Sequence, residues 1–187
     1  IALLNQAPTR LVVALADVGF GLDDATVLPN ALELRRDGVP MTPGADFAFS
    51  YDAATDEITL TPTAPLTDAL YEILFSTGRA AISDLGSNPL STAGLSLGID
   101  GVGPTPQISL PVPGADVEND PGYVEIRWVD SGPAGVDAST LGPDDVLVTG
   151  IPVHAIEDAG GGTWRYHYQP DTADGLLTDG PLTISLS

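Results

Sequence analysis

The chain has 187 residues, with 26 acidic and 6 basic side chains and a formal net charge of −20. This charge argues against nucleic acid and anionic membrane surfaces as partners, because proteins bind both through Lys and Arg. The basic residues are all Arg and there is no Cys, which excludes lysine Schiff-base chemistry, disulfides, thiolate nucleophiles and Cys-ligated metals. No apolar run approaches the roughly 20 residues that span a bilayer, so no membrane insertion is predicted.

Alternating apolar residues predict β-strands throughout the chain. Gly and Pro recur too often for long helices, and no segment has a helical apolar stripe of helix length. Asp37-Gly38 and the link over residues 52–56 have the chemistry of hairpin turns. The alternation is clearest over residues 11–15, 47–51, 58–60, 124–128 and 164–168. Several short strands per ~100 residues favour an all-β fold built from Greek-key β-sandwiches.

An internal repeat divides the chain into two expected modules. Gly21–Val27 matches Gly135–Leu141 at an offset of 114 residues, and three further blocks follow the same order at offsets of 111 to 114. The further matches are 11–15 with 124–128, 31–34 with 145–148, and 66–73 with 177–184. We therefore predict domains over residues 1–102 and 107–187, joined by the Gly/Pro-rich segment 101–106.

Four blocks of the first module carry a family resemblance. They are Asp23–Val27, Ile58–Pro62, Leu66–Ile73 and the loop Asp84–Leu90, in which Ser87 stands where the family has Gly. With these blocks the module resembles the bacterial immunoglobulin-like (Ig-like) domains of S-layer and other large cell-surface proteins. The resemblance implies two tandem Ig-like antiparallel β-sandwiches.

The second module departs from this pattern at its end. It has Tyr168-Gln169-Pro170 where the first has Leu60-Thr61-Pro62, and Ser187 precedes any counterpart of the Asp84–Leu90 loop. The second module is therefore expected to lack its last strand, with an edge that is exposed or completed by the next part of a parent protein. The start at Ile1, without Met or a basic leader, also indicates an excised piece of a longer chain.

Acidic residues in two places are candidates for calcium binding, namely the repeated Asp loop and the join between the modules. Asp23 and Asp137 are expected to cap a short helical turn, with a Ca²⁺ site that includes Asp17 and Asp24, or Asp130, as the alternative. Near the join between the modules, the hypothesis is a Ca²⁺ site, and the alternative is a solvated acidic linker that binds no metal. The candidate ligands there are Asp100, Asp116, Glu118, Asn119 and Asp120. Apart from Ca²⁺, no cofactor is predicted.

A run of aromatic residues and the two histidines are the candidates for binding and catalysis. Trp164, Tyr166 and Tyr168 share one strand face, which is expected to pack in the core, with sugar stacking as the alternative. Trp128 is expected in the core as well. The two histidines, His154 and His167, belong to no nucleophile or metalloprotease motif, so no catalytic residue and no enzyme activity are predicted.

These observations lead to one expected function and one alternative. The expected function is that of non-catalytic spacer and interaction modules of a large bacterial surface or secreted protein, located outside the cell or on its surface. The expected partners are adjacent domains of the parent protein, and a surface protein or glycan. The alternative is a Ca²⁺-dependent adhesin, or a carbohydrate-binding accessory module of an extracellular enzyme.

Overall fold

The chain forms an all-β structure, as the sequence predicts. The computed structural model describes residues 1–91, 94–115, 121–148, 151–168 and 182–186, and its regular elements are strands and three-residue 3-10 turns. Unit 1 comprises residues 1–102 with 132–134, and unit 2 comprises residues 103–131 with 135–187. None of the helical turns in the described residues is long and apolar enough to cross a bilayer.

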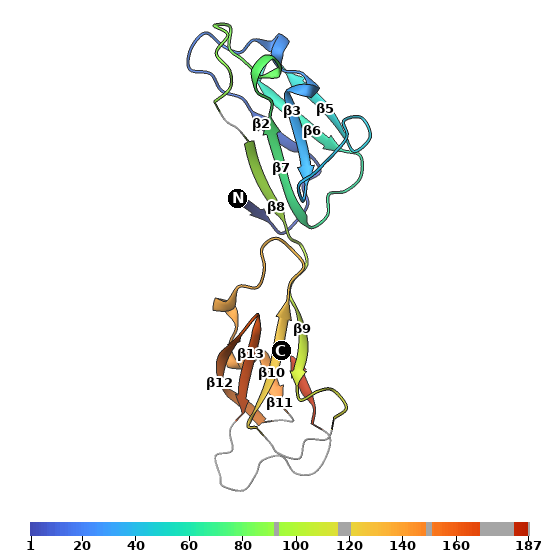
Figure 1. Cartoon of the computed structure of the whole chain (residues 1–187), viewed down its shortest axis with the longest axis vertical. Coiled ribbons are helices and arrows are strands. Elements are labelled where there is room, and N and C mark those ends of the chain that lie inside the picture. Colours follow the sequence, from blue (N-terminus) through green and yellow to red (C-terminus); the bar gives the residue numbers. More distant parts are fainter. Residues whose placement is uncertain (92–93, 116–120, 149–150, 169–181, 187) are drawn as a thin grey trace. The chain divides into compact units, whose positions relative to one another are not determined.

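Unit 1 contains two sheets (Figure 1). In the five-stranded sheet β1 pairs with β8 in parallel, and every other neighbouring pair of strands in unit 1 is antiparallel. The five-stranded sheet has the order β1 (Ala2–Leu4), β8 (Gly94–Ile99), β7 (Ala69–Phe75), β3 (Leu32–Arg36), β4 (Val39–Pro40). The three-stranded sheet has the order β2 (Leu11–Ala14), β6 (Glu57–Pro62), β5 (Phe47–Asp52).

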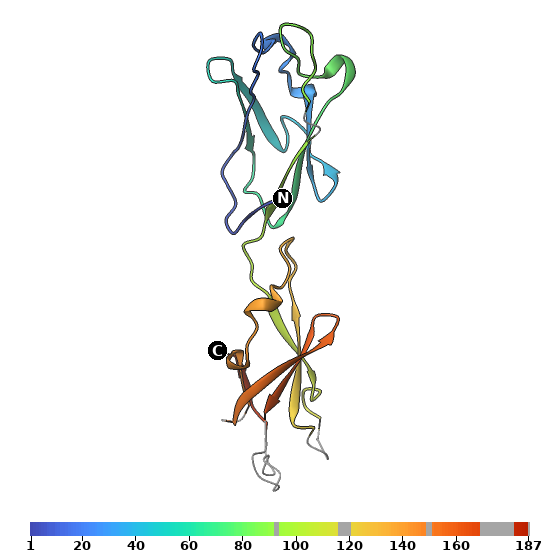
Figure 2. The same cartoon turned by 90° about the vertical axis from the view of Figure 1, so that its left-hand side faces the viewer.

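The core of unit 1 lies between these two sheets. Side chains alternate between the two faces of a strand, and along β7 every second residue is buried. Leu34 of the first sheet and Ile58 and Leu60 of the second have no exposed surface and belong to one apolar cluster. Unit 1 is therefore a β-sandwich, and Figure 2 shows its two layers from the side.

Both predicted hairpins of unit 1 are confirmed. Asp37 and Gly38 join β3 to β4 with φ angles of 49° and 78°, the left-handed backbone that a two-residue hairpin turn requires. The link after Asp52 joins β5 to β6, which pair along their full length.

Unit 2 is built on a sheet in which one long strand has two partners. The first residues of β12 pair with β11, and the rest pair with β13, with a register shift between Val153 and Ala155. The apolar core lies under both halves and includes Val124, Ile126, Val146, Val148, Val153, Tyr166 and Tyr168. The strand order is β14 (Ile184–Leu186), β11 (Val146–Val148), β12 (Ile151–Gly160), β13 (Thr163–Tyr168), β10 (Tyr123–Val129), β9 (Thr105–Leu110).

The two units share one pairing scheme. Leu34 pairs with Ile73 in unit 1, and Val148 pairs with Ile184 in unit 2, which are the positions that the sequence repeat aligns. The correspondence continues two residues further along these strands, where Leu32 pairs with Phe75 in unit 1 and Val146 pairs with Leu186 in unit 2. In the other layer, the order β2-β6-β5 corresponds to β10-β13-β12. The long β12 thus occupies the places that β4 and β5 hold separately in unit 1.

Candidate functional site

Asp23 and Asp137 cap equivalent 3-10 turns, η1 (Asp24–Thr26) and η4 (Ala138–Thr140), as predicted. Asp23 Oδ1 accepts the N–H of Ala25 at 3.2 Å, and Asp137 Oδ1 accepts the N–H of Ser139 at 3.0 Å. The Ser139 hydroxyl also donates to Asp137 Oδ1 at 2.7 Å, and this bond, with the N–H, lowers the pKa of Asp137. Both carboxylates therefore serve as helix-turn caps.

Two of the other acidic residues in the calcium alternative, Asp17 and Asp24, accept hydrogen bonds from the protein itself. Asp17 Oδ2 accepts two backbone N–H groups of its own loop, at 2.9 and 2.8 Å. Asp24 Oδ1 accepts the hydroxyl of Tyr51, and Asp130 directly follows β10. Within the described ranges, no three His, Cys, Asp or Glu side chains gather closely enough to hold a metal ion.

The calcium hypothesis for the join concerns residues that the structure describes only in part. Asp100 directly follows β8, is half-buried, and donates its backbone N–H to the carbonyl of Leu4 at 2.9 Å. Asp116, Glu118, Asn119 and Asp120 lie outside the described residues. The hypothesis therefore stays a prediction.

Tyr51 of β5 connects two acidic residues that the sequence analysis did not bring together. Its hydroxyl lies 2.7 Å from Asp24 Oδ1 and 3.0 Å from Asp56 Oδ1, and it donates its single proton to this pair of acceptors. Partial burial, followed by the two carboxylates, raises the pKa of Tyr51, because each disfavours a phenolate. The contact ties the η1 turn to the β5–β6 hairpin.

The aromatic face of β13 points into the core. Tyr166 and Tyr168 are 0% and 1% exposed, which confirms their predicted packing, and the half-buried Trp164 packs against the same cluster. Trp128 is also half-buried there, and its Nε1 donates to the Tyr166 hydroxyl at 2.9 Å. The enclosed rings of Tyr166 and Tyr168 therefore offer no free face to a sugar, whereas the Trp164 ring is only partly covered.

The opposite face of the same strand carries a polar cluster that the sequence analysis missed. We call it the outer cluster, and it consists of Tyr123, Glu125, Glu157, Arg165 and His167. Arg165 Nε donates to Glu125 Oε1 at 2.9 Å, and its Nη1 lies 3.7 Å from Glu157 Oε2. The Arg165 guanidinium lies 5.0 Å from the centre of the Tyr123 ring, and His167 Nε2 lies 3.2 Å from Glu157 Oε2.

The outer cluster links the three neighbouring strands β10, β13 and β12 through side-chain contacts. Its members are cross-strand neighbours, since Glu125 and Glu157 both pair with Arg165, and Tyr123 pairs with His167. The hydrogen bond with Glu125 is the main reason why the pKa of Arg165 is raised. None of the five is a Ser, Thr or Cys nucleophile, and Arg165 is already paired on both sides, so the cluster is suited to holding the sheet together.

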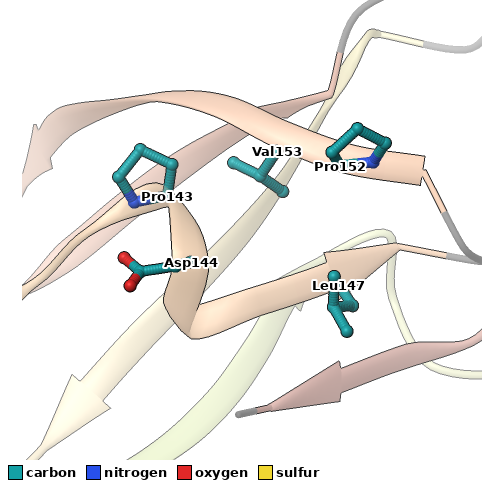
Figure 3. A pocket seen from close by; sticks show the side chains of 5 residues that line it. All are labelled: Pro143, Asp144, Leu147, Pro152 and Val153. Carbon is teal, nitrogen blue, oxygen red and sulfur yellow. The ribbon is translucent and has the colours of Figure 1, made fainter.

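Unit 2 also has an open depression of about 440 Å³, lined by Pro143, Asp144, Leu147, Pro152 and Val153 (Figure 3). Pro143 and Asp144 come from the turn η5 (Pro143–Asp145), and the others from β11 and β12. Four of the five side chains are apolar and the fifth is a single carboxylate. The lining thus supplies no pair of groups for acid–base chemistry.

The comparisons with known proteins add no family assignment. No protein-family model matches this chain, and no curated protein matches it.

Proposed function

We propose that the chain is a pair of non-catalytic Ig-like modules that act as spacer and interaction units in a large bacterial surface or secreted protein. The observation that supports this proposal most is the repetition of one pairing scheme, with the same register between β3 and β7 as between β11 and β14. Each unit also has an apolar cluster of its own. Repeated modules with separate cores lengthen a polypeptide and hold distal domains away from its anchor.

Two further features support the Ig-like part of this proposal. Unit 1 is a sandwich of two sheets in which the first strand, β1, runs parallel to the last, β8. Its Asp84–Leu90 loop is closed by Asp84, whose carboxylate accepts the backbone and side-chain N–H groups of Asn88 at 2.7 and 2.8 Å. These bonds hold Ser87 at a φ of 65°, a left-handed conformation that explains the Gly of the family pattern.

Small-angle X-ray scattering tests the spacer proposal. A single compact globule of this length has a radius of gyration of about 16 Å, whereas two touching spheres of ~95 residues have about 20 Å. We expect 20 Å or more. A value near 16 Å would contradict the proposal.

Mechanical unfolding provides the second test. Two modules of ~95 residues that unfold one after the other each release about 300 Å of chain, at ~3.4 Å per residue. We expect two such events of similar length. One event that releases the whole chain at once would show that the units do not resist force as separate modules.

A further inference from the structure

Three large apolar side chains are exposed at one end of unit 1. Val18 is fully exposed, and Phe20 and Leu85 are 79% and 67% exposed. The first two belong to the connection between β2 and β3, and Leu85 belongs to the connection between β7 and β8. Both connections lie at the same end of unit 1 in Figures 1 and 2. We call these three side chains the apolar tip.

Backbone pairing holds the two connections of the apolar tip side by side. The Leu85 N–H donates to the Gly21 carbonyl at 2.9 Å, and Leu22 and Asp84 form an antiparallel bridge. Phe20 directly precedes this pairing, so Phe20 and Leu85 come from adjoining backbone segments. The apolar tip is therefore one surface that two distant parts of the sequence build together.

The loop that carries Val18 and Phe20 is also fixed from within. Asp17 Oδ2 accepts the N–H groups of Gly19 and Gly21 at 2.9 and 2.8 Å. These bonds wrap the backbone around the Asp17 carboxylate, while neither apolar side chain packs into the core. A loop that is ordered beforehand loses less conformational entropy when it binds.

The fold itself does not require the apolar pair of this loop. Between the same two aligned blocks of the repeat, the segment after β10 is Asp-Ser-Gly-Pro-Ala over residues 130–134, without a branched aliphatic or aromatic side chain. The second copy of the repeat thus forms its turn without counterparts of Val18 and Phe20. Exposed apolar side chains that have no role in the fold are typical of interaction surfaces on loops.

The loops at this end of unit 1 are strongly acidic. The hairpin 52–56 lies beside the loop after β2, since the Leu15 N–H donates to the Asp56 carbonyl at 2.8 Å. Together with this hairpin, segments 15–31 and 76–91 contain six Asp and one Arg. This charge attracts Lys and Arg, and it opposes nucleic acid, anionic lipid and the same loops of a second copy.

We propose that the apolar tip is a docking site for a partner protein whose contacting surface has apolar side chains flanked by Lys or Arg. Phe20 and its aliphatic neighbours supply the central apolar contact, and the Asp residues favour a basic rim on the partner. A glycan fits less well, because Val18 and Leu85 offer no ring face to a sugar. This docking specifies the interaction part of the proposed function, on which it rests, and the spacer part does not depend on it.

The test selects partners from a phage library of random short peptides. The full chain is the immobilised target, and the double variant Val18→Ser/Phe20→Ser is added in solution as a competitor. We expect the enriched peptides to carry a net positive charge and apolar residues. Enrichment of acidic peptides, or of none that prefers the parent chain to the double variant, would overturn the proposal.

Matched variants then locate the binding of an enriched peptide. Val39 of β4 is 65% exposed and follows the other end of β3, so Val39→Ser is the control. The double variant should lose at least about tenfold in affinity, as expected for a central anchor, and Val39→Ser should bind like the parent. Equal losses in the two variants would contradict a site at the apolar tip. Because the replaced side chains are exposed, both variants should keep the denaturation midpoint of the parent.

Salt and alternative occupants complete the test. The affinity should fall between about 0.05 and 0.5 M NaCl, because screening weakens the attraction between Asp carboxylates and Lys or Arg. An affinity that does not change would contradict the basic rim. Phosphatidylcholine vesicles should not bind, and light scattering should show a monomer. Vesicle binding or a dimer that the double variant abolishes would assign the apolar tip to a membrane or to a second copy, and would overturn the partner-protein proposal without affecting the spacer proposal.

Discussion

Substitution of Leu34 by Ala should unfold unit 1 at lower denaturant concentration without changing unit 2. Leu34 is fully buried in the cluster of unit 1. The substitution removes three carbon atoms at about 0.8 kcal/mol each and leaves a cavity, so we expect unit 1 to lose about 3–4 kcal/mol of unfolding free energy. The matched substitution at the aligned position of unit 2, Val148→Ala, removes two carbons and should cost about 2–3 kcal/mol.

Tryptophan fluorescence makes this comparison direct. The chain has two Trp residues, Trp128 and Trp164, and both belong to unit 2. At about 1–2 kcal/mol per molar urea, Val148→Ala should lower the urea midpoint of the fluorescence transition by about 1–3 M, and Leu34→Ala should leave that midpoint unchanged. Circular dichroism, which reports both units, should show an early transition in Leu34→Ala. If Leu34→Ala moved the fluorescence midpoint as far as Val148→Ala does, the two units would form one cooperative structure and our reasoning would be refuted.

The further predictions concern the contacts of Tyr166 and Asp137 and the calcium hypothesis for residues 116–120. Tyr166→Phe leaves Trp128 Nε1 without its acceptor and should cost about 1 kcal/mol by fluorescence-detected unfolding. Because burial raises the pKa of Tyr166, stability should fall as the pH rises above about 10, and this fall should be smaller in Tyr166→Phe; identical alkaline profiles would argue against it. Asp137→Ala should lower the free energy of unfolding of unit 2 above about pH 4. This loss relative to the parent chain should vanish as the pH falls through the lowered pKa of Asp137. A loss that is the same at every pH would show that the charge of Asp137 is not involved. If residues 116–120 bind Ca²⁺ at roughly 0.1–1 mM, about 10 mM CaCl₂ should stabilise the fold by about 1.4–2.7 kcal/mol, whereas an equal effect of monovalent salt at matched ionic strength would indicate screening alone.

Local patterns were sufficient to predict much of the fold. The Asp37-Gly38 hairpin follows from two adjacent residues that both tolerate a left-handed backbone. The caps at Asp23 and Asp137 follow from a carboxylate two residues before the N–H that it accepts. The burial of Tyr166 follows from the period of two along a strand. In each case the deciding residues lie within a few positions of one another.

The features that the sequence analysis missed depend on which strands are neighbours. The alternation on β13 places Arg165 opposite to Tyr166, but the partners Glu125 and Glu157 are 40 and 8 residues away and become known only from the register. The Tyr51 hydroxyl likewise meets Asp24 across 27 positions. Such contacts depend on strand order and register, which no local pattern in a single sequence determines.

The first strands of the two units lie in different places. In unit 1, β1 pairs with β8 in parallel, whereas in unit 2, β9 pairs with β10 in the other half of the sheet. Residues 2–4 and 105–110 both lie outside the blocks that the repeat aligns. The repeat therefore predicts the pairing of the aligned strands, but it carries no information on where the first strand of each unit is placed.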